Sequence, residues 1–336
     1  MYANRLSLMT IPARLHFCWI GGNLPWAYVF AILSAAERSE LPEIILHHTD
    51  ILEDGDKLRA LKYASRVRLS QIRPENYLAQ TGKALGLGDE LVVLYRKLEK
   101  PVMRADILRA AILYSEGGIY MDLDTITVAS LLPLIGTRDF VGLEFIVWPR
   151  FVRLSRSPAL WARHLTLDLL RKLLRRMPHG WRVFKRVAKF YVRSVNNAVM
   201  GAEANSRFFS GYLHAMLRLP RERQTRLYGL GPRLLQEVVD QYAHQDLTIQ
   251  DPQVFYPLPP EISEHWFRIG KSVALNDVLS ADTRVVHWYA SVRTEHLVAR
   301  ITPKYVLENR ARQLYSALVY SCIGKVLQSY NQPQRY

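Results

Sequence analysis

The sequence predicts an α/β fold in which a mixed sheet of strands is flanked by helices. A strand, a glycine turn, a helix and a second strand follow one another at the start of the chain, which is how a doubly wound sheet begins. Apolar residues make up 49% of the 336 residues, which is enough to fill the core of one large domain. The same composition argues against a disordered chain.

The first elements are two buried strands on either side of a helix. Residues 14–20 form a compact apolar run that ends at a glycine pair, which indicates a strand and a turn. Residues 26–37 have a helical pattern, and residues 43–48 indicate the second buried strand. Farther along, residues 67–70 fit a short strand and residues 77–85 fit a helix.

The clearest helix covers residues 103–115 and leads into the motif on which the functional prediction rests. Its apolar residues recur at helical spacing, and a Gly-Gly pair provides a natural stop. Residues 119–121 then predict a short strand, which is followed by Asp122 and Asp124. Alternate side chains of a strand lie on one face, so the two carboxylates should point the same way.

Two like charges held this close repel each other unless a positive charge lies between them. Mg²⁺ and Mn²⁺ prefer oxygen ligands and often bridge carboxylates to substrate phosphates. The aspartates also follow the carboxyl end of a predicted strand, the usual ligand position in open α/β folds. We therefore predict a metal-diphosphate site at Asp122 and Asp124, with Mn²⁺ or Mg²⁺ as the cofactor.

The helix before this motif carries Asp106 and Arg109, which are three residues apart and so are neighbours on its surface. This spacing fits a structural ion pair near the start of the helix, where an acidic residue suits the helix dipole. It fits a ligand-binding pair equally well. The spacing alone leaves both interpretations open.

The second half of the chain continues the alternation of strands and helices. His287 lies in a late apolar strand, and Gly231 and Pro232 form a turn before a helix. The elements that we predict here are strands at 139–147, 196–202 and 284–289, helices at 206–217 and 234–242, an extended piece at 254–258, and a final helical pattern at 305–329.

Residues 150–193 are unusually basic for a chain whose net charge is already +15. This stretch holds 13 lysines and arginines and a single acid, Asp168, with leucines and aromatic residues interleaved. Residues 178–180 divide it into two amphipathic helices. Such helices can lie on an anionic membrane surface, cover an ordinary insertion with a solvated face, or bind nucleic acid. The membrane surface is the interpretation we favour, and we expect no nucleic-acid partner.

We expect residues 1–336 to form a single catalytic domain, with a basic helical insertion at about 150–194 and a C-terminal helical segment at about 303–330. The two cysteines, Cys18 and Cys322, lie in apolar contexts, which favours a reducing compartment. Neither a signal-peptide pattern nor an apolar run of about 20 residues is present. We therefore expect a cytoplasmic protein that is peripheral at the inner membrane face.

With these segments in view, the chain resembles the glycosyltransferases that carry a DXD motif, in particular glycosyltransferase family 32 of the capsular and initiating mannosyltransferase type. The catalytic domains of clostridial glucosylating toxins are a more distant likeness. Residues 11–22 resemble the opening strand of the family, residues 104–109 its central helix, and residues 117–124 its DXD strand. The pairs at 196–197 and 231–232 resemble later landmarks.

This resemblance implies a GT-A-type, Rossmann-like fold and a metal-dependent, retaining glycosyltransferase. The donor would be a UDP or GDP sugar, from which a hexose moves to a glycolipid or polysaccharide intermediate. The resemblance implies that the anomeric configuration of the sugar is retained. Because the sequence has no clear second carboxylate to form a covalent intermediate, we favour attack by the acceptor on the same face that the diphosphate leaves.

The resemblance also implies roles for particular residues. Asp122 and Asp124 would hold the nucleotide sugar and Mn²⁺ or Mg²⁺, with Asp124 the more direct ligand. His287 lies where related folds bring a C-terminal residue to the metal or diphosphate. The remaining roles are base stacking for Trp19, contacts to ribose and to diphosphate or sugar for Asp106 and Arg109, the nucleotide pocket for Tyr120, the sugar or acceptor side for Asn197, and donor binding for Ser291.

One position departs from the family pattern, because Val292 follows Ser291 where the family often has a Ser-Trp pair. Ordinary structural roles also remain open at other positions: Trp19 and Trp288 could be core residues, and His287 a hydrogen-bonded core histidine.

Three other functions fit part of the sequence. A secreted effector that glycosylates a host protein would use the same chemistry on another acceptor. A haloacid-dehalogenase-like phosphatase would use Asp122 as its nucleophile, although that motif normally follows the first strand of its fold. A non-enzymatic module that binds membrane or nucleic acid would explain the basic stretch but leave the aspartate pair unexplained.

Overall fold

The computed structural model of the protein describes residues 11–242 and 246–330. Its main sheet has seven strands in the order β3-β2-β1-β4-β7-β6-β8. Strands β1 to β4 run parallel, β7 is antiparallel to β4 and β6, and β8 is parallel to β6. The strands are β1 (Arg14–Trp19), β2 (Glu43–His48), β3 (Val67–Gln71), β4 (Gly118–Met121), β6 (Asp139–Ile146), β7 (Val192–Ala202) and β8 (Leu247–Gln250).

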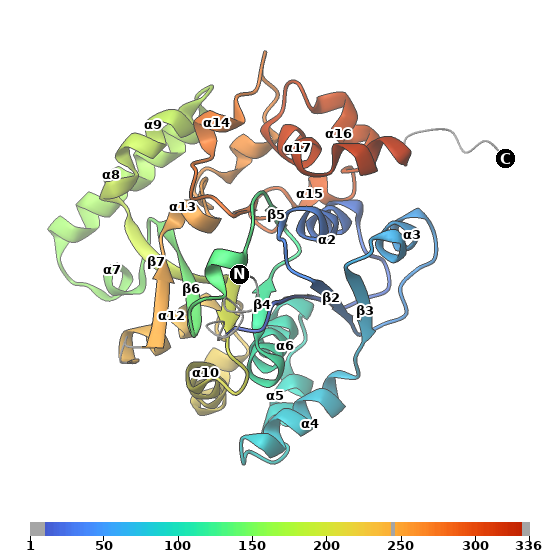
Figure 1. Cartoon of the computed structure of the whole chain (residues 1–336). Helices are drawn as coiled ribbons and strands as arrows, with labels where there is room; N and C mark the ends of the chain where they lie inside the picture. Colours follow the sequence, from blue (N-terminus) through green and yellow to red (C-terminus); the bar gives the residue numbers. More distant parts are fainter. Residues whose placement is uncertain (1–10, 243–245, 331–336) are drawn as a thin grey trace.

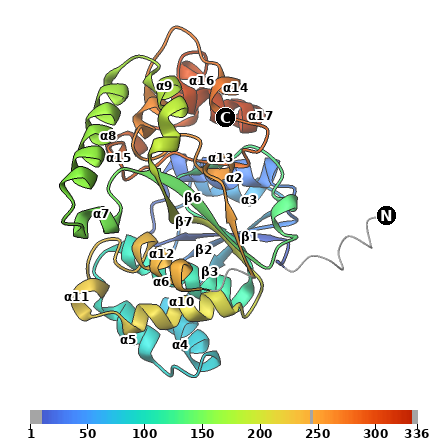
Figure 2. The same cartoon turned by 90° about the vertical axis from the view of Figure 1, so that its left-hand side faces the viewer.

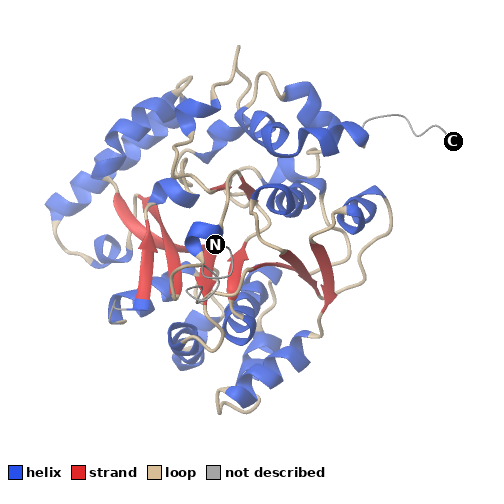
Figure 3. Cartoon of the chain, in the orientation of Figure 1, coloured by secondary structure: helices blue, strands red, loops and turns tan. Residues whose placement is uncertain are grey.

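Helices lie on both faces of this sheet, so the predicted α/β class is confirmed (Figure 3). The longer ones are α2 (Trp26–Arg38), α3 (Asp56–Tyr63), α4 (Pro74–Ala84), α5 (Glu90–Lys97), α6 (Pro101–Glu116), α8 (Pro158–Arg176), α9 (Gly180–Val187), α10 (Arg207–Arg218), α12 (Pro232–Gln241), α16 (Pro303–Asn309) and α17 (Leu314–Ser329). In Figure 1, α2 and α17 lie on one side of the strands, and α6, α10, α5 and α4 on the other.

The alternation of side chains along the strands creates two apolar cores, one on each face of the sheet. On β1, Leu15 and Phe17 belong to the core that includes α2, whereas Cys18 belongs to the core that includes α6. All three side chains are buried. Strands buried on both faces read as continuous apolar runs, which is why β1 and β2 could be recognised from the sequence.

A second, two-stranded sheet brings a late segment of the chain back to the centre. Strands β5 (Thr125–Thr127) and β9 (Val285–His287) pair in antiparallel fashion, with Thr125 opposite His287. Because β5 begins just after the aspartate pair, this pairing fixes where the late histidine lies.

The basic stretch forms helices with a break where the sequence predicts it. After the short helix α7 (Arg150–Leu154), α8 ends at Arg176 and α9 begins at Gly180. A Cβ atom at Gly180 would lie 1.8 Å from the carbonyl oxygen of Leu174, so only glycine fits this close approach. The remaining short helices in the chain are α11 (Arg221–Gln224), α13 (Pro252–Phe255), α14 (Leu275–Val278) and α15 (Glu295–Val298).

Two predicted elements need correction. The extended piece at 254–258 is wrong, because helix α13 occupies part of it and begins with Pro252 at a position where proline favours a helix. The C-terminal helical pattern is two helices, since Gln313 has extended backbone between α16 and α17 and bridges to Ile269. None of the described helices is both long and apolar enough to cross a membrane.

Candidate active site

Asp122 and Asp124 lie at the carboxyl end of β4, in the turn that joins it to β5. The prediction that a short strand ends at Met121 and is followed by the two aspartates is confirmed, but neither aspartate belongs to a strand, so strand alternation does not apply to them. The backbone N–H of Asp122 still donates to the carbonyl of Ala198 (2.8 Å), and the Thr125 hydroxyl donates to the carbonyl of Asp122 (2.7 Å). The carboxylates converge because of this turn rather than through strand alternation.

Asp124 is held by the last residue of β9 and by the turn that follows this strand. The imidazole Nε2 of His287 lies 3.0 Å from Asp124 Oδ1, and the backbone N–H of Ala290 donates to Oδ2 at 2.8 Å. Between them, Tyr289 has φ of 59°, a left-handed conformation that non-glycine residues rarely adopt. This turn directs the Ala290 N–H toward the carboxylate, and such local strain often marks functional sites.

Asp122 is held by the helix and strand that precede it. Arg109 Nη1 on α6 donates to Asp122 Oδ2 at 3.0 Å, and the Tyr120 hydroxyl on β4 donates to Oδ1 at 3.1 Å. The guanidinium of Arg109 also lies over the Tyr120 ring, 5.0 Å from its centroid. Both carboxylate oxygens of Asp122 are thus oriented by hydrogen bonds from Arg109 and Tyr120.

A second layer of polar groups lies deeper, behind Arg109. Asn197 Nδ2 donates to Asp106 Oδ1 at 2.8 Å, and the Asn197 carbonyl accepts from Arg109 Nη1 at 2.8 Å. Arg109 Nη2 lies 3.6 Å from Asp106 Oδ1. A Cβ atom at Gly231 would lie 2.9 Å from Asp106 Oδ2, so this layer leaves no room for a side chain there.

Exposure separates the two layers. The side chains of Asp122 and Asp124 are 24% and 15% exposed, whereas those of Asp106 and Arg109 are 6% and 4% exposed. Asn197 is also buried. The predicted contacts of Asp106, Arg109 and Asn197 with donor or acceptor stay predictions; the described geometry has these side chains positioning Asp122.

The electrostatics of the exposed layer are uneven. Burial raises the pKa of Asp122; the charge of Arg109 opposes this rise and the charge of Asp124 adds to it. Burial alone would raise the pKa of Asp124, but the charge and hydrogen bond of His287, with the Ala290 N–H, hold it below its usual value. Burial disfavours charged His287, yet the charge of Asp124 keeps the pKa of His287 above its ordinary value.

The deeper layer contains one carboxyl group whose pKa is raised toward physiological pH. Burial raises the pKa of Asp106 to about 6, although the charge of Arg109 and the hydrogen bond from Asn197 act against it. Arg109, by contrast, keeps its charge because Asp122 and the other groups around it outweigh its burial. The layer therefore presents a fixed cation to the back of Asp122.

The exposed layer fits a divalent cation. One ligand atom from each of Asp122, Asp124 and His287 lies within 4.8 Å of the other two. Carboxylate oxygens with one imidazole suit Mn²⁺ and related ions, and both carboxylates are partly open to solvent. The Nδ1 atom of His287 is buried with no hydrogen-bond partner among the described residues.

The other predicted donor residues lie around this centre in different ways. Trp19 is at the end of β1, with its ring centroid 5.4 Å from that of Tyr28 and its Nε1 buried without a partner among the described residues. Tyr120 is buried, and the hydrogen bond that its hydroxyl donates to Asp122 orients that carboxylate. Ser291 is exposed and follows Ala290. Base stacking by Trp19 and donor binding by Ser291 stay predictions.

Two contributors were not foreseen from the sequence. Glu144 on β6 is buried, and it accepts a hydrogen bond from the Tyr289 hydroxyl at 2.7 Å, beside His287. Burial raises its pKa to about 7. An acid in the middle of the otherwise apolar run from Phe140 to Ile146 was the available signal. The Ala290 N–H left no signal, since a backbone donor does not depend on residue type.

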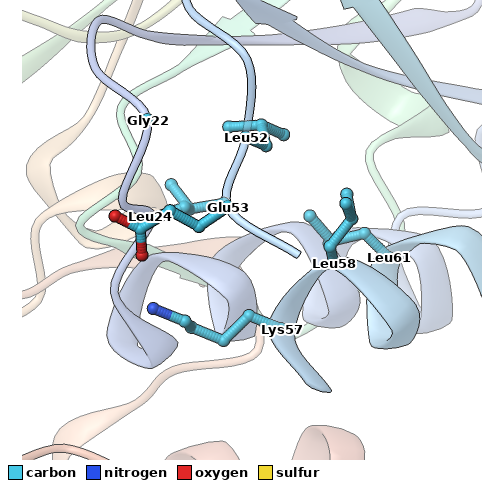
Figure 4. Close-up of a pocket in the computed structure, with 7 residues that line it drawn as sticks. All are labelled: Gly22, Leu24, Leu52, Glu53, Lys57, Leu58 and Leu61. Atoms are coloured by element: carbon cyan, nitrogen blue, oxygen red, sulfur yellow. The ribbon is translucent and has the colours of Figure 1, made fainter. Parts of the chain in front are cut away.

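A small pocket elsewhere in the molecule is separate from this site. Figure 4 shows it between the loops after β1 and β2 and helix α3, with Leu52 and Leu58 among its apolar residues. Its volume of about 10 Å³ is close to the minimum for one water molecule. It is far too small for a nucleotide sugar.

The comparison with protein families matches residues 70–141 to the glycosyltransferase sugar-binding region containing a DXD motif. This segment runs from β3 into β6 and includes Asp106, Arg109, Asp122 and Asp124. The chain therefore carries a glycosyltransferase region with its DXD motif at the carboxyl end of β4. No curated protein matches the sequence.

Several solved glycosyltransferases resemble the chain in structure at low identity. PaToxG glycosyltransferase is 16% identical with a TM-score of 0.43, over 71% of this chain and 76% of the other. The UDP-bound glycosyltransferase domain of the YGT toxin is 9% identical with a TM-score of 0.40, over 72% and 80%. Galactosyltransferase LgtC, bound to donor and acceptor sugar analogs, is 13% identical with a TM-score of 0.39, over 86% and 96%. Likenesses this weak say nothing about the donor or acceptor of this chain.

Proposed function

We propose that this protein is a metal-dependent, retaining glycosyltransferase of the family 32 type. It moves a hexose from a UDP or GDP sugar to a glycolipid or polysaccharide intermediate. The observation that carries the proposal is the convergence of Asp122, Asp124 and His287 at the carboxyl end of β4. Both aspartates belong to the segment that matches a DXD sugar-binding region, and His287 joins them from outside it.

Asp122, Asp124 and His287 would hold Mn²⁺ or Mg²⁺ in this enzyme. A divalent cation bound there would neutralise the charge that develops on the leaving diphosphate. The protein keeps its carboxylates in place before the donor arrives, because Arg109 and Tyr120 orient Asp122 while the Ala290 N–H orients Asp124. Preorganised charges of this kind stabilise a transition state without rearranging as it forms.

The transfer step follows from retention without a covalent intermediate. The bond between the anomeric carbon and the diphosphate oxygen breaks while the acceptor oxygen bonds to the same face of the sugar. The proton of the acceptor hydroxyl passes to an oxygen of the departing diphosphate. Because the departing diphosphate takes this proton, the transfer needs no general base from the protein.

Phosphatase chemistry at Asp122 fits the geometry less well. The hydrogen bonds that Tyr120 and Arg109 donate to Oδ1 and Oδ2 of Asp122 withdraw electron density from the carboxylate that a phosphatase would use as its nucleophile. The aspartate pair also follows the fourth strand in the chain rather than the first.

The experiment is a donor screen. Release of free sugar or nucleoside diphosphate is measured across UDP and GDP sugars with Mn²⁺, with Mg²⁺ and with a chelator. We expect hydrolysis of at least one donor that requires the metal, and no release of phosphate from p-nitrophenyl phosphate. Phosphate release that is lost in Asp122→Asn, without any donor hydrolysis, would establish the phosphatase instead.

A further inference from the structure

We propose that the outer face of helix α8 docks on an anionic membrane surface. This face carries an apolar stripe, defined as Trp161, Leu165, Leu169, Leu173 and Met177, whose members are four residues apart. They are 39% to 57% exposed, although they are large apolar side chains. Residues four apart are neighbours on a helix surface and advance by about 40° around the axis at each step, so the stripe is continuous and runs obliquely across the exposed side of α8.

The stripe is not the core-facing side of α8, because the helix has a complete inner side of its own. His164, Leu167 and Leu174 are buried. The His164 imidazole Nδ1 lies 2.6 Å from the Val147 carbonyl, and the Tyr191 hydroxyl donates to the Leu167 carbonyl at 3.0 Å. The fold therefore fixes α8 in one orientation with its apolar stripe facing outward.

The charges around the stripe are positive. Asp168, the single acid between residues 150 and 193, is buried and paired with Arg171 and Lys172. Arg163 and Arg176 on α8 are exposed, and neither forms an ion pair within the described part of the chain. Arg156, in the turn before α8, is exposed in the same way. Arg156, Arg163 and Arg176 thus lie beside the stripe without an ion pair in the described part of the chain, whereas Glu261 and Glu264 pair with Arg171 and Arg175 of α8.

Helix α7 extends the apolar surface at the start of α8. Phe151 and Leu154 are both exposed. The Phe151 ring lies 6.3 Å from that of His164, and the Trp148 ring lies 5.3 Å from that of Trp161, so the two helices are packed together. Figure 2 shows α7 and α8 along one outer edge of the molecule.

This combination of charges and apolar groups fits an anionic lipid surface better than the other occupants. Nucleic acid would be bound by the cations but would gain nothing from a row of leucines. An interfacial helix uses both, since leucine and tryptophan enter the acyl boundary while lysine and arginine meet anionic headgroups. A second copy of this chain would present the same positive charges to its partner, which opposes that contact.

The surface also lies at the end of the sheet that carries the aspartate pair. Strand β4 ends at Met121, which lies opposite Val199 of β7. Strands β6 and β7 continue past this point in the same direction and stay paired as far as Ile146 and Val192. Helices α7 to α9 form the connection at that far end. A docked enzyme would then meet a lipid-borne acceptor, and this one consequence rests on the proposed function.

The test is vesicle co-sedimentation of the full chain. Vesicles of phosphatidylcholine are compared with vesicles that also contain phosphatidylglycerol, at low and high salt. The variant L165Q/L169Q/L173Q removes the centre of the stripe. The control V93Q/V102Q/I269Q also replaces three exposed aliphatic side chains by glutamine, at positions outside α7 to α9. Melting temperatures establish that each variant is folded.

We expect wild type and control to sediment with the anionic vesicles, less so at high salt, and the stripe variant to partition at least about tenfold more weakly. The proposal fails if wild type does not bind anionic vesicles, or if the folded stripe variant binds like wild type. It also fails if the stripe instead supports self-association in the absence of vesicles. Donor hydrolysis is assayed separately, so failure here and failure of the proposed function are distinguishable.

Discussion

Residues 11–242 and 246–330 contain two clusters of three potential metal ligands, and only one of these two has the electrostatics of a metal site. Asp122, Asp124 and His287 form the first, and His16, His47 and Glu116 the second. In each, one ligand atom per residue lies within 4.8 Å of the others. Proximity alone therefore does not distinguish them.

In the histidine cluster both nitrogens of His16 and one of His47 are hydrogen-bonded, and His47 Nδ1 is buried without a partner among the described residues. His16 Nε2 lies 2.8 Å from the Gly117 carbonyl, which can only accept, so this nitrogen carries the proton. His16 Nδ1 must then accept from His47 Nε2, 2.9 Å away. Burial lowers the pKa of His16 well below its usual value and that of His47 to about 4, so both rings are neutral at pH 7. Glu116 accepts from the Tyr77 hydroxyl at 2.8 Å.

The aspartate cluster differs in charge and in access. It combines two carboxylates that are partly exposed, and the ion-pair partners that the described residues give them are Arg109 behind Asp122 and His287 beside Asp124. A site with negative charge facing solvent attracts a cation, whereas a buried neutral pair gains little from one. The comparison teaches that solvent-facing negative charge distinguishes the candidate metal site better than the spacing of its ligand atoms does.

The largest expected effect is the loss of Arg109. Arg109→Leu leaves Asp122 and Asp106 without their buried cation, and breaking a buried ion pair costs about 3–5 kcal/mol. We expect a loss of that order in the free energy of unfolding, measured by urea denaturation. The matched change Arg138→Leu removes an exposed arginine paired with Asp246 and should cost less than about 1 kcal/mol. Equal losses in the two variants would show that the Arg109 network does not support the site.

The next effect is catalytic. Asp124→Asn keeps the shape of the side chain but removes its charge, so metal-dependent donor hydrolysis should fall at least about 10²-fold, as when one charge-stabilising group is removed from an active site. The control Asp282→Asn changes an exposed aspartate and should leave the rate unchanged. Near-normal hydrolysis by folded Asp124→Asn at saturating Mn²⁺ would refute the site assignment.

The histidine cluster should respond in stability and not in metal dependence. His47→Leu leaves His16 Nδ1 as a buried acceptor without a donor, which costs about 1–3 kcal/mol. The Mn²⁺ concentration that gives half-maximal hydrolysis should stay as in wild type. A shift of that concentration would mean that the second cluster also binds the metal.

The same variant tests the pH behaviour of the cluster. The pKa of His47 is about 4 in the folded chain and near 6.5 when unfolded, so between these values the unfolded state binds the proton more readily. The contribution of His47 is therefore fully present above about pH 6.5 and is lost as pH falls toward 4. We expect the difference in unfolding free energy between wild type and His47→Leu to shrink from pH 7 to pH 5. A difference that stays constant would contradict the lowered pKa.

The smallest effect concerns the packing behind the site. In Gly231→Ala the new Cβ would lie 2.9 Å from Asp106 Oδ2 and 3.1 Å from Asn197 Nδ2, so one of them must shift. Overpacking of this kind costs about 1–3 kcal/mol. Gly211→Ala is the control, since a Cβ there meets nothing within 4 Å. Equal unfolding free energies for the two variants would show that Asp106 and Asn197 can move aside for the new methyl group at no cost.

The sequence predicted the sheet and the centre of the site because those parts depend on local patterns. Buried strands such as β1 and the helix that carries Asp106 and Arg109 have apolar residues at fixed spacing, and the aspartates follow directly in the chain. The turn at Asp122 to Asp124 was not predictable in this way. It depends on β5 pairing with β9, about 160 residues later in the chain.

Burial was the second property that the sequence could not provide. Asp106 and Arg109 are polar residues on a helix, and their spacing fits a solvent-facing pair as well as a buried one. Only the packing of Asn197 and Gly231 against them decides the matter. The same limit applied to residues 150–193, where Leu165 and Leu167 look alike in the sequence but lie on opposite sides of α8.

The most direct test of the central claim is Mn²⁺ binding to the full chain, followed by the loss of the free Mn²⁺ signal in electron paramagnetic resonance, with and without UDP or GDP. Wild type, Asp124→Asn and His47→Leu are compared. The account predicts one Mn²⁺ per chain in wild type and in His47→Leu, and a strong loss of affinity in Asp124→Asn. Unchanged binding by Asp124→Asn, or lost binding by folded His47→Leu, would contradict it.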